Sequence, residues 1–167
     1  MFGFQCEMAK IEPSLKQPAI FLSTLGGIGY LPKAPGTWAS LITLAPVFFI
    51  QKYTEPVGLI VFCSLIFIIG IWACTHHEIL TKSLDPKHCV IDECLGQSLV
   101  LLFTPNDPIF YLLAFVYFRF FDIVKPWPTH WFDRNVKGGL GVMFDDVVAG
   151  AQAIIAMILT HKLLNVF

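Results

Sequence analysis

The run of residues 57–74 constrains the fold most, because 18 successive positions carry no charged side chain. A helix of that length and composition is long enough to cross the hydrocarbon core of a membrane. The composition agrees: 56% of the residues are hydrophobic and 14% are charged, against about 45–50% and about 25% in soluble domains. The sequence therefore predicts a membrane protein.

Four shorter apolar segments accompany this run, at 38–50, 94–103, 109–118 and 147–160. Each would need flanking residues to cross a membrane, and each could instead be a buried or interfacial helix. Turn-forming residues such as Glu55-Pro56 separate the segments, and none has the alternating pattern of a strand. We expect an all-α fold, a compact multi-helix bundle embedded in the membrane. The expected domain plan is one domain over 1–167, with an N-terminal tail at 1–18, a helical membrane domain at about 19–160 and a C-terminal tail at 161–167.

The basic residues are distributed asymmetrically if all five segments cross. Nine of the eleven then share the side of the N-terminus, and only Lys52 and Lys162 lie on the other. Basic loops stay in the cytoplasm, so the loops at 32–37, 76–93 and 119–146 are predicted to be cytoplasmic. The net charge of −1 offers no basic surface to a nucleic-acid backbone, so no nucleic-acid partner is expected. The nine residues are Lys10, Lys16, Lys33, Lys82, Lys87, Arg119, Lys125, Arg134 and Lys137.

A loop rich in glycine and proline, at 26–38, opens the first of these segments. Thr37 is a candidate N-cap, and the free N–H groups beside it could receive an anion to which Lys33 would add positive charge. The alternative is an interfacial turn with a capped helix and a lysine that extends to the membrane surface. Residue spacing alone leaves both interpretations open.

Carboxylates adjoin two other apolar segments. Asp92 and Glu93 stand at the start of 94–103, and Asp145-Asp146 leads into 147–160 after a glycine-rich turn. Acidic residues at a helix N-terminus are favoured by the helix dipole and can act as caps, which would be a purely structural role. Neighbouring carboxylates at a membrane boundary nevertheless repel each other, and a divalent cation removes that cost.

One face of the protein would thus carry five carboxylates, of which Asp122 is the fifth. Hard oxygen ligands of this kind suit Mg²⁺, which binds through a few carboxylates and substrate phosphate oxygens. Lys125 could pair with Asp122 at i, i+3, or it could contribute with other cations to binding a phosphoryl group. Metal, cations and membrane surface together predict chemistry on a phospholipid head group. The cations are Lys33, Arg119, Lys125 and Lys137.

Four ordered blocks of the chain resemble the phosphatidylglycerophosphatase A family of bacterial membrane enzymes. One departure is Ala39, where the family pattern has glycine, and it concerns helix packing. The blocks are 29–38 (GYLPKAPGTW), 91–93 (IDE) with Gly96, 121–126 (FDIVKP), and 137–146 (KGGLGVMFDD) with Ala149 and Gly150.

The resemblance implies a Mg²⁺-dependent phosphatase that removes the terminal phosphate of phosphatidylglycerophosphate and yields phosphatidylglycerol, in glycerophospholipid biosynthesis. It also implies an all-helical fold particular to the family. The implied protein is a multi-pass hydrolase of the bacterial inner membrane, with a phospholipid substrate and a cytoplasmic active face. The numbers of metal ions and of spans are left open by the sequence, and so is the oligomeric state, a homo-oligomer included.

On this basis all five carboxylates are predicted to be catalytic residues. Glu93, Asp122, Asp145 and Asp146 are expected to bind Mg²⁺, with Asp92 as the base or as an alternative ligand. The attacking group can be water or a carboxylate that forms a phospho-enzyme. The expected contacts to the substrate phosphate are Lys33, Thr37, Lys125 and Lys137.

Other phosphatase classes lack their signatures in this sequence. No Cys lies six positions before Arg119 or Arg134, no Asp-x-Asp occurs, and two arginines are too few for the arginine- and histidine-based lipid phosphatases. The G-x-S-x-G elbow of an acyl-chain hydrolase is also absent. Two alternatives stay open: another Mg²⁺-dependent head-group enzyme, such as a phosphotransferase, although its D-G-x₂-A-R motif is absent, and a non-catalytic small cation transporter.

Overall fold

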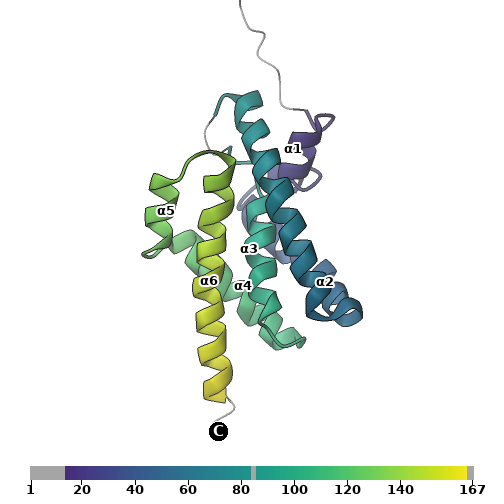
Figure 1. The fold of residues 1–167 in the computed structure, drawn as a ribbon, viewed down its shortest axis with the longest axis vertical. Coiled ribbons are helices and arrows are strands. Elements are labelled where there is room, and N and C mark those ends of the chain that lie inside the picture. Colours follow the sequence, from purple (N-terminus) through teal and green to yellow (C-terminus); the bar gives the residue numbers. More distant parts are fainter. Residues whose placement is uncertain (1–13, 84–85, 165–167) are drawn as a thin grey trace, which may run out of the picture.

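The computed structural model describes residues 14–83 and 86–164, and every regular element in that part of the chain is a helix. The all-α expectation is therefore confirmed (Figure 1). Residues 1–13 and 165–167, which belong to the two expected tails, lie outside the described residues. The elements in chain order are α1 (Pro18–Ser23), the 3₁₀ turn η1 (Ile28–Tyr30), α2 (Pro35–Thr81), α3 (Ile91–Leu102), α4 (Pro108–Val124), α5 (Thr129–Asn135) and α6 (Gly138–Leu164).

Helix α2 consists of two arms that meet at a kink. Glu55 lies in the kink with φ 55° and ψ −167°, outside the helical region, and Pro56 follows it. Proline disfavours a helical conformation at the residue before it, so the kink falls where the sequence predicts a turn. The apolar segments at 38–50 and 57–75 are the two arms (Figure 1).

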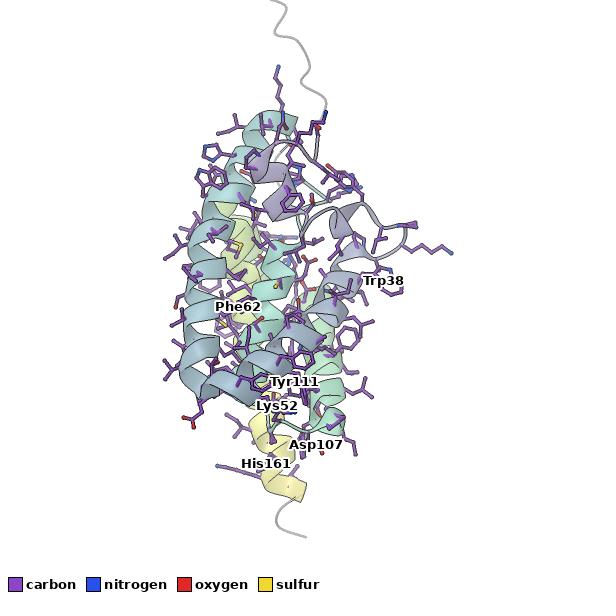
Figure 2. All side chains as sticks on the ribbon, turned by 90° about the vertical axis from the view of Figure 1, so that its right-hand side faces the viewer. Trp38, Lys52, Phe62, Asp107, Tyr111 and His161 are labelled. Carbon is purple, nitrogen blue, oxygen red and sulfur yellow. The ribbon has the colours of Figure 1, made fainter. Side chains whose placement is uncertain are left out.

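At one end of the bundle, the ends of four helices contact one another. The Gln51 side chain donates from Nε2 to the Leu101 carbonyl oxygen at 2.7 Å and accepts a hydrogen bond from the Tyr111 hydroxyl. The ring of Phe110 lies 5.6 Å from that of His161. The first arm of α2, the C-terminal end of α3, the start of α4 and the end of α6 therefore meet there. Figure 2 shows Lys52, Asp107, Tyr111 and His161 toward this end.

Helix α3 forms the centre of the bundle. It packs against α2, α4 and α6, and eight of its twelve residues are buried. Gly96 permits this packing, because a Cβ there would overlap the Phe118 ring of α4 and would lie 3.0 Å from the Asp146 carbonyl oxygen of α6. Gly150 of α6 faces the Gly96 backbone at a distance that leaves little room for a side chain. At about 1.5 Å per residue, α3 is shorter than the hydrocarbon core, so it is a buried core helix.

Two helices are long and apolar enough to cross a membrane, Pro35–Thr81 and Gly138–Leu163. Their outer surfaces, together with that of α4, carry large exposed apolar side chains. Ile68, Ile109 and Ile155 are 66%, 70% and 60% exposed, for example. Exposed apolar surface on this scale is typical of a protein whose helices face lipid.

Candidate active site

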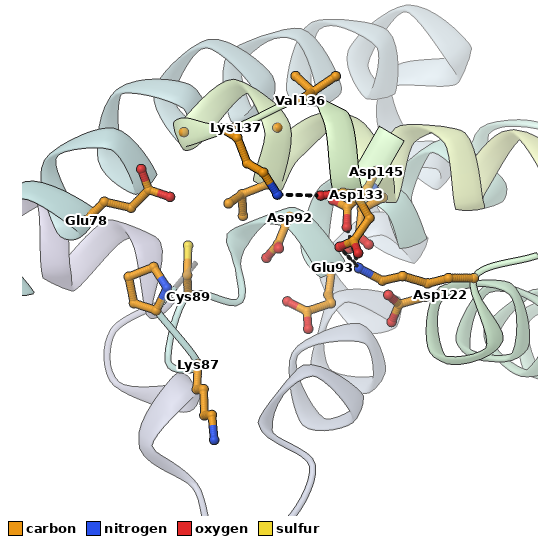
Figure 3. Close-up of a pocket in the computed structure, with 16 residues that line it drawn as sticks. Glu78, Lys87, Cys89, Asp92, Glu93, Asp122, Asp133, Val136, Lys137 and Asp145 are labelled. Carbon is orange, nitrogen blue, oxygen red and sulfur yellow. Dashed lines mark hydrogen bonds and ion pairs between the residues drawn. The ribbon is translucent and has the colours of Figure 1, made fainter. Parts of the chain in front are cut away.

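A polar cavity of about 440 Å³ lies where the N-terminal ends of α3 and α6 meet the C-terminal end of α4. All five predicted catalytic carboxylates line it, although they come from three different helices. Figure 3 shows Asp92, Glu93 and Asp122 extending toward the same space. The predicted residues that line the cavity are Asp92, Glu93, Asp122, Lys125, Lys137, Asp145 and Asp146.

Three of the carboxylates form a compact group. Asp92, Glu93 and Asp146 can each present one oxygen such that all three oxygens lie within 4.8 Å of one another. Each of these residues also has a buried oxygen without a hydrogen-bond partner among the described residues: Asp92 Oδ1, Glu93 Oε2 and Asp146 Oδ2. Buried, unpaired carboxylate oxygens are costly, and a cation bound between them would satisfy them. The donor set is hard oxygen and fits Mg²⁺.

The other two carboxylates hold basic side chains. Arg119 Nη1 lies 2.6 Å from Asp122 Oδ2 and 3.9 Å from Glu93 Oε1. Lys125 Nζ donates to Asp145 Oδ2 at 2.6 Å. Asp122 and Asp145 are both predicted to bind metal. In the structure they form ion pairs with the side chains of Arg119 and Lys125 at the wall of the cavity.

Lys125 also donates to Asp133 Oδ1 at 2.6 Å, so it bridges α5 and α6. Burial alone lowers its pKa, but the Asp145 carboxylate and the hydrogen bonds to Asp133 and Asp145 outweigh burial and raise the pKa above its usual range. The hydrogen bond from Lys125 lowers the pKa of Asp133. Both groups are therefore held in their charged forms at neutral pH.

The i, i+3 pairing of Asp122 with Lys125 is not formed. Lys125 stands at the C-cap of α4 with φ 45° and ψ 56°, a left-handed conformation that ends the helix. The chain leaves the helical course at this residue, so the lysine no longer shares a helical face with Asp122. Arg119, one turn earlier on α4, takes its place as the partner of Asp122.

The 29–38 block reaches the site through a glycine. A Cβ on Gly36 would overlap the Glu93 carboxyl group, so only glycine lets the start of α2 lie against this side chain. Lys33 is exposed, with φ 60°, and is not among the residues that line the cavity.

The prediction that Thr37 is an N-cap is wrong. Helix α2 begins at Pro35, with Ala34 at the N-cap position, because proline is favoured at the first helical position. The N–H groups of Thr37 and Trp38 both donate to the Ala34 carbonyl oxygen, at 3.0 and 3.3 Å, so neither is free for an anion. Thr37 instead lines an apolar groove beside α4.

Three charged residues that were not predicted from the sequence also line the cavity: Glu78, Lys87 and Asp133. Asp133 lies on α5, a short polar helix without apolar periodicity, so no pattern links it to the site. Hydrogen bonds anchor this region to α6: Thr129 donates to Gln152 Oε1 at 2.7 Å, and Gln152 Nε2 donates to the Trp127 carbonyl oxygen at 3.0 Å. The basic character of Lys87, close in sequence to Asp92, was the one available signal.

Comparison with known proteins gives a consistent result. The family model described as phosphatidylglycerophosphatase A matches residues 21–161. A phosphatidylglycerophosphatase A of Escherichia coli strain K12 is 35% identical over 147 residues, covering 86% of this chain and 84% of its own length. Its counterpart in Haemophilus influenzae strain Rd is 36% identical, covering 86% and 89%.

A third relative carries a different name. A protein of Bacteroides thetaiotaomicron with a provisional assignment as a phosphatidylinositol-3-phosphatase is 36% identical, covering 84% of this chain and 94% of its own length. No solved structure matches the chain.

Proposed function

The chain belongs to the phosphatidylglycerophosphatase A family, and from this premise we propose that it hydrolyses the terminal phosphate of phosphatidylglycerophosphate to give phosphatidylglycerol. The observation that carries the proposal is the convergence of seven carboxylates, among them all five predicted catalytic ones, and three lysines on one cavity. The reaction breaks the P–O bond of a phosphomonoester and releases inorganic phosphate and the lipid alcohol. A site for it needs positive charge for the phosphate and an activated oxygen nucleophile.

We propose Mg²⁺ as the cofactor, held chiefly by Asp92, Glu93 and Asp146. Their unpartnered oxygens support this assignment, and it gives Asp92 the ligand role rather than that of the base. A bound Mg²⁺ would neutralise phosphate charge and favour an attacking oxygen nucleophile. Asp122 and Asp145 complete the acidic wall while their charge is balanced by Arg119 and Lys125.

The basic side chains of the cavity would bind the phosphoryl group. Lys125 is held by Asp133 and Asp145, so its ammonium group is positioned before substrate arrives. Lys137 donates to the Asp133 carbonyl oxygen at 3.2 Å and lines the same cavity, as does Lys87. Lys33 and Thr37 lie outside the cavity, so this proposal gives them no contact with the terminal phosphate.

We also propose that the protein is a multi-pass protein of the bacterial inner membrane with the cavity on the cytoplasmic side. Two apolar helices and the bacterial relatives support membrane association. The excess of basic residues in the loops near the cavity supports the orientation.

The test is phosphate release by the purified protein in mixed micelles of phosphatidylglycerophosphate. Turnover should depend on Mg²⁺, stop on treatment with EDTA, and return when Mg²⁺ is added. Turnover that is unchanged after metal removal would contradict the cofactor assignment.

The Bacteroides relative makes a different lipid phosphomonoester the second candidate substrate. Phosphatidylinositol 3-phosphate should therefore be assayed beside phosphatidylglycerophosphate at equal surface concentration. A higher kcat/KM for the inositol lipid would assign phosphatidylinositol 3-phosphate as the substrate instead of phosphatidylglycerophosphate. No release from either lipid would favour a cation transporter.

A further inference from the structure

A second, apolar groove of about 330 Å³ lies on the outer surface of α4, beside the start of α2. Its walls are almost wholly apolar, and much of their surface is exposed: Val116 by 50%, Phe120 by 55%, Ile123 by 68% and Val124 by 55%. Val116, Arg119, Phe120 and Ile123 are spaced i, i+3, i+4 and i+7, so they occupy one face of the helix.

Arg119 connects this groove with the acidic cavity. Its side chain lines the groove, while its Nη1 lies 2.6 Å from Asp122 Oδ2 and 3.9 Å from Glu93 Oε1, and both carboxylates line the cavity. A 3.4 Å hydrogen bond from Nη1 to Ser40 Oγ and the Phe118 ring, 5.9 Å from the guanidinium carbon, further restrict it. The arginine is thus a fixed boundary between an apolar and an acidic compartment.

The guanidinium group has an unused donor. Arg119 Nε is buried and has no hydrogen-bond partner among the described residues, although the side chain as a whole is 13% exposed. A buried N–H of a charged group without an acceptor is costly. An anionic oxygen of a ligand in the groove would satisfy it.

We propose that this groove binds the diacylglycerol end of the lipid substrate, with Arg119 hydrogen-bonded to the phosphodiester that follows it. The acyl chain would lie on Val116, Phe120 and Ile123, and the terminal phosphate would reach the cavity. The inference rests on the proposed lipid phosphatase function and deepens it. It specifies a diacyl lipid that carries a second anionic group between its chains and its terminal phosphate.

The position of the groove explains how a lipid could reach a polar site without leaving the bilayer. The groove lies on exposed apolar helix surface, where lipid chains contact the protein. Apolar walls for the chains and one cation at the inner end match the polarity of such a lipid. The tails can remain in the hydrocarbon while the head group enters between α2 and α4.

Groove-filling substitutions test the proposal. Val116→Trp and Ile123→Trp should raise KM for dioleoyl phosphatidylglycerophosphate about tenfold, the equivalent of two lost CH₂ contacts. The same variants should hydrolyse the deacylated head group, glycerophosphoglycerol phosphate, at the parental rate. An unchanged KM for the diacyl lipid in both variants would overturn the proposal.

Matched controls exist on the second arm of α2, among residues that do not line the groove. Val61 is 52% exposed and Ile68 is 66% exposed, so each matches its counterpart in residue type and exposure. Val61→Trp and Ile68→Trp should leave unchanged both the KM for the diacyl lipid and the rate on the deacylated head group. A KM increase in the controls equal to that in the groove variants would indicate a general surface effect and would also overturn the proposal.

Arg119→Lys separates recognition of the phosphodiester from the ion pair with Asp122, because lysine keeps the charge and lacks Nε. Its kcat/KM should fall about tenfold for phosphatidylglycerophosphate, the order of one lost charged hydrogen bond. The loss of kcat/KM should be clearly smaller for phosphatidic acid, which has no phosphodiester and so reports only the effect on the ion pair. An equal loss of kcat/KM on both lipids would contradict the proposed contact between Arg119 and the phosphodiester.

A binding experiment distinguishes failure of this proposal from failure of the proposed function. Parental protein in dioleoyl vesicles would be irradiated with a phosphatidylglycerol probe that carries a diazirine in its acyl chain, and the adducts mapped by mass spectrometry. Adducts should concentrate on residues 115–124 of α4 and fall in Val116→Trp, whether or not the protein turns over any substrate. Adducts spread evenly over the apolar surface, or protein–protein cross-links through α4 that show a second copy in the groove, would refute it.

Discussion

Asp146 and Asp145 are neighbours in the sequence but have different surroundings. Asp145 holds Lys125, whereas Asp146 is 3% exposed and keeps one oxygen unpartnered beside Asp92 and Glu93. The sequence treats the two carboxylates alike because they share one turn of one helix. Their partners come from α3 and from the turn after α4, so only the folded chain separates the two roles.

Asp146→Asn should leave the protein inserted and folded but should lower kcat about 100- to 1,000-fold at low Mg²⁺. The amide preserves the shape of the side chain and removes a charged ligand from the group of three. Phosphate release measured across a Mg²⁺ titration should show partial recovery at high concentration.

The control is Asp107→Asn at the opposite end of the bundle. Asp107 caps α4 through bonds from the N–H groups of Ile109 and Phe110, and asparagine caps a helix about equally well. Its kinetics should match those of the parent. If Asp146→Asn turned over substrate at the parental rate at low Mg²⁺, Asp146 would not be a metal ligand and the metal would have to bind to other residues.

Lys125→Met should lower kcat/KM, with a rise of about 2–4 kcal/mol in the activation free energy, by analogy with removal of a positioned oxyanion donor. Methionine retains the apolar stem and loses the ammonium group that Asp133 and Asp145 hold. Initial rates on phosphatidylglycerophosphate measure the effect, with Lys52→Met as the control, because Lys52 is exposed and distant from the cavity. A Lys125→Met protein as fast as the parent would reduce this lysine to a structural link between α5 and α6.

The short helix α3 shows what an apolar pattern can and cannot predict. The segment at 94–103 is mostly apolar and carries no charged side chain, which is equally typical of a spanning helix and of a buried one. The kink at Glu55 was predictable, because Pro56 acts locally. The burial of α3 depends on contacts with α2, α4 and α6, which local pattern does not contain.

Gly96→Ala tests this central packing. The added methyl group would overlap the Phe118 ring and approach the α6 backbone, and overpacking of a filled core costs about 1–3 kcal/mol. The variant should lower the Tm in detergent and, because α3 and α6 carry four of the five predicted catalytic carboxylates, should also lose activity. Val61→Ala is the comparison, since Val61 is 52% exposed on the second arm of α2 and alanine adds no atom there. A Tm equal to that of the parent in Gly96→Ala would show that α3 and α6 can separate without cost.

Across the whole molecule, the polar groups are divided between two ends. The cavity lies where α3 and α6 begin and α4 ends, and Gln51, Leu101 and Tyr111 join the opposite ends of the helices. The charge asymmetry of the sequence predicted this division, because nine of the eleven basic residues fall in segments expected on one side of the membrane. The apolar groove had no comparable signal, since lipid-facing residues have the same composition whether or not they surround a ligand.

The two-ended arrangement makes membrane topology a test of the site itself. Lys87 and Lys137 line the same cavity, so they must lie on the same side of the bilayer. Reporter fusions after each of them should therefore both give cytoplasmic signals, because basic loops are retained there. Fusions after Glu55, in the kink of α2, and after Asp107, at the cap of α4, should both give periplasmic signals. Opposite signals from Lys87 and Lys137 would place the walls of the cavity on two sides of the membrane, and no single site could then hold the five carboxylates together.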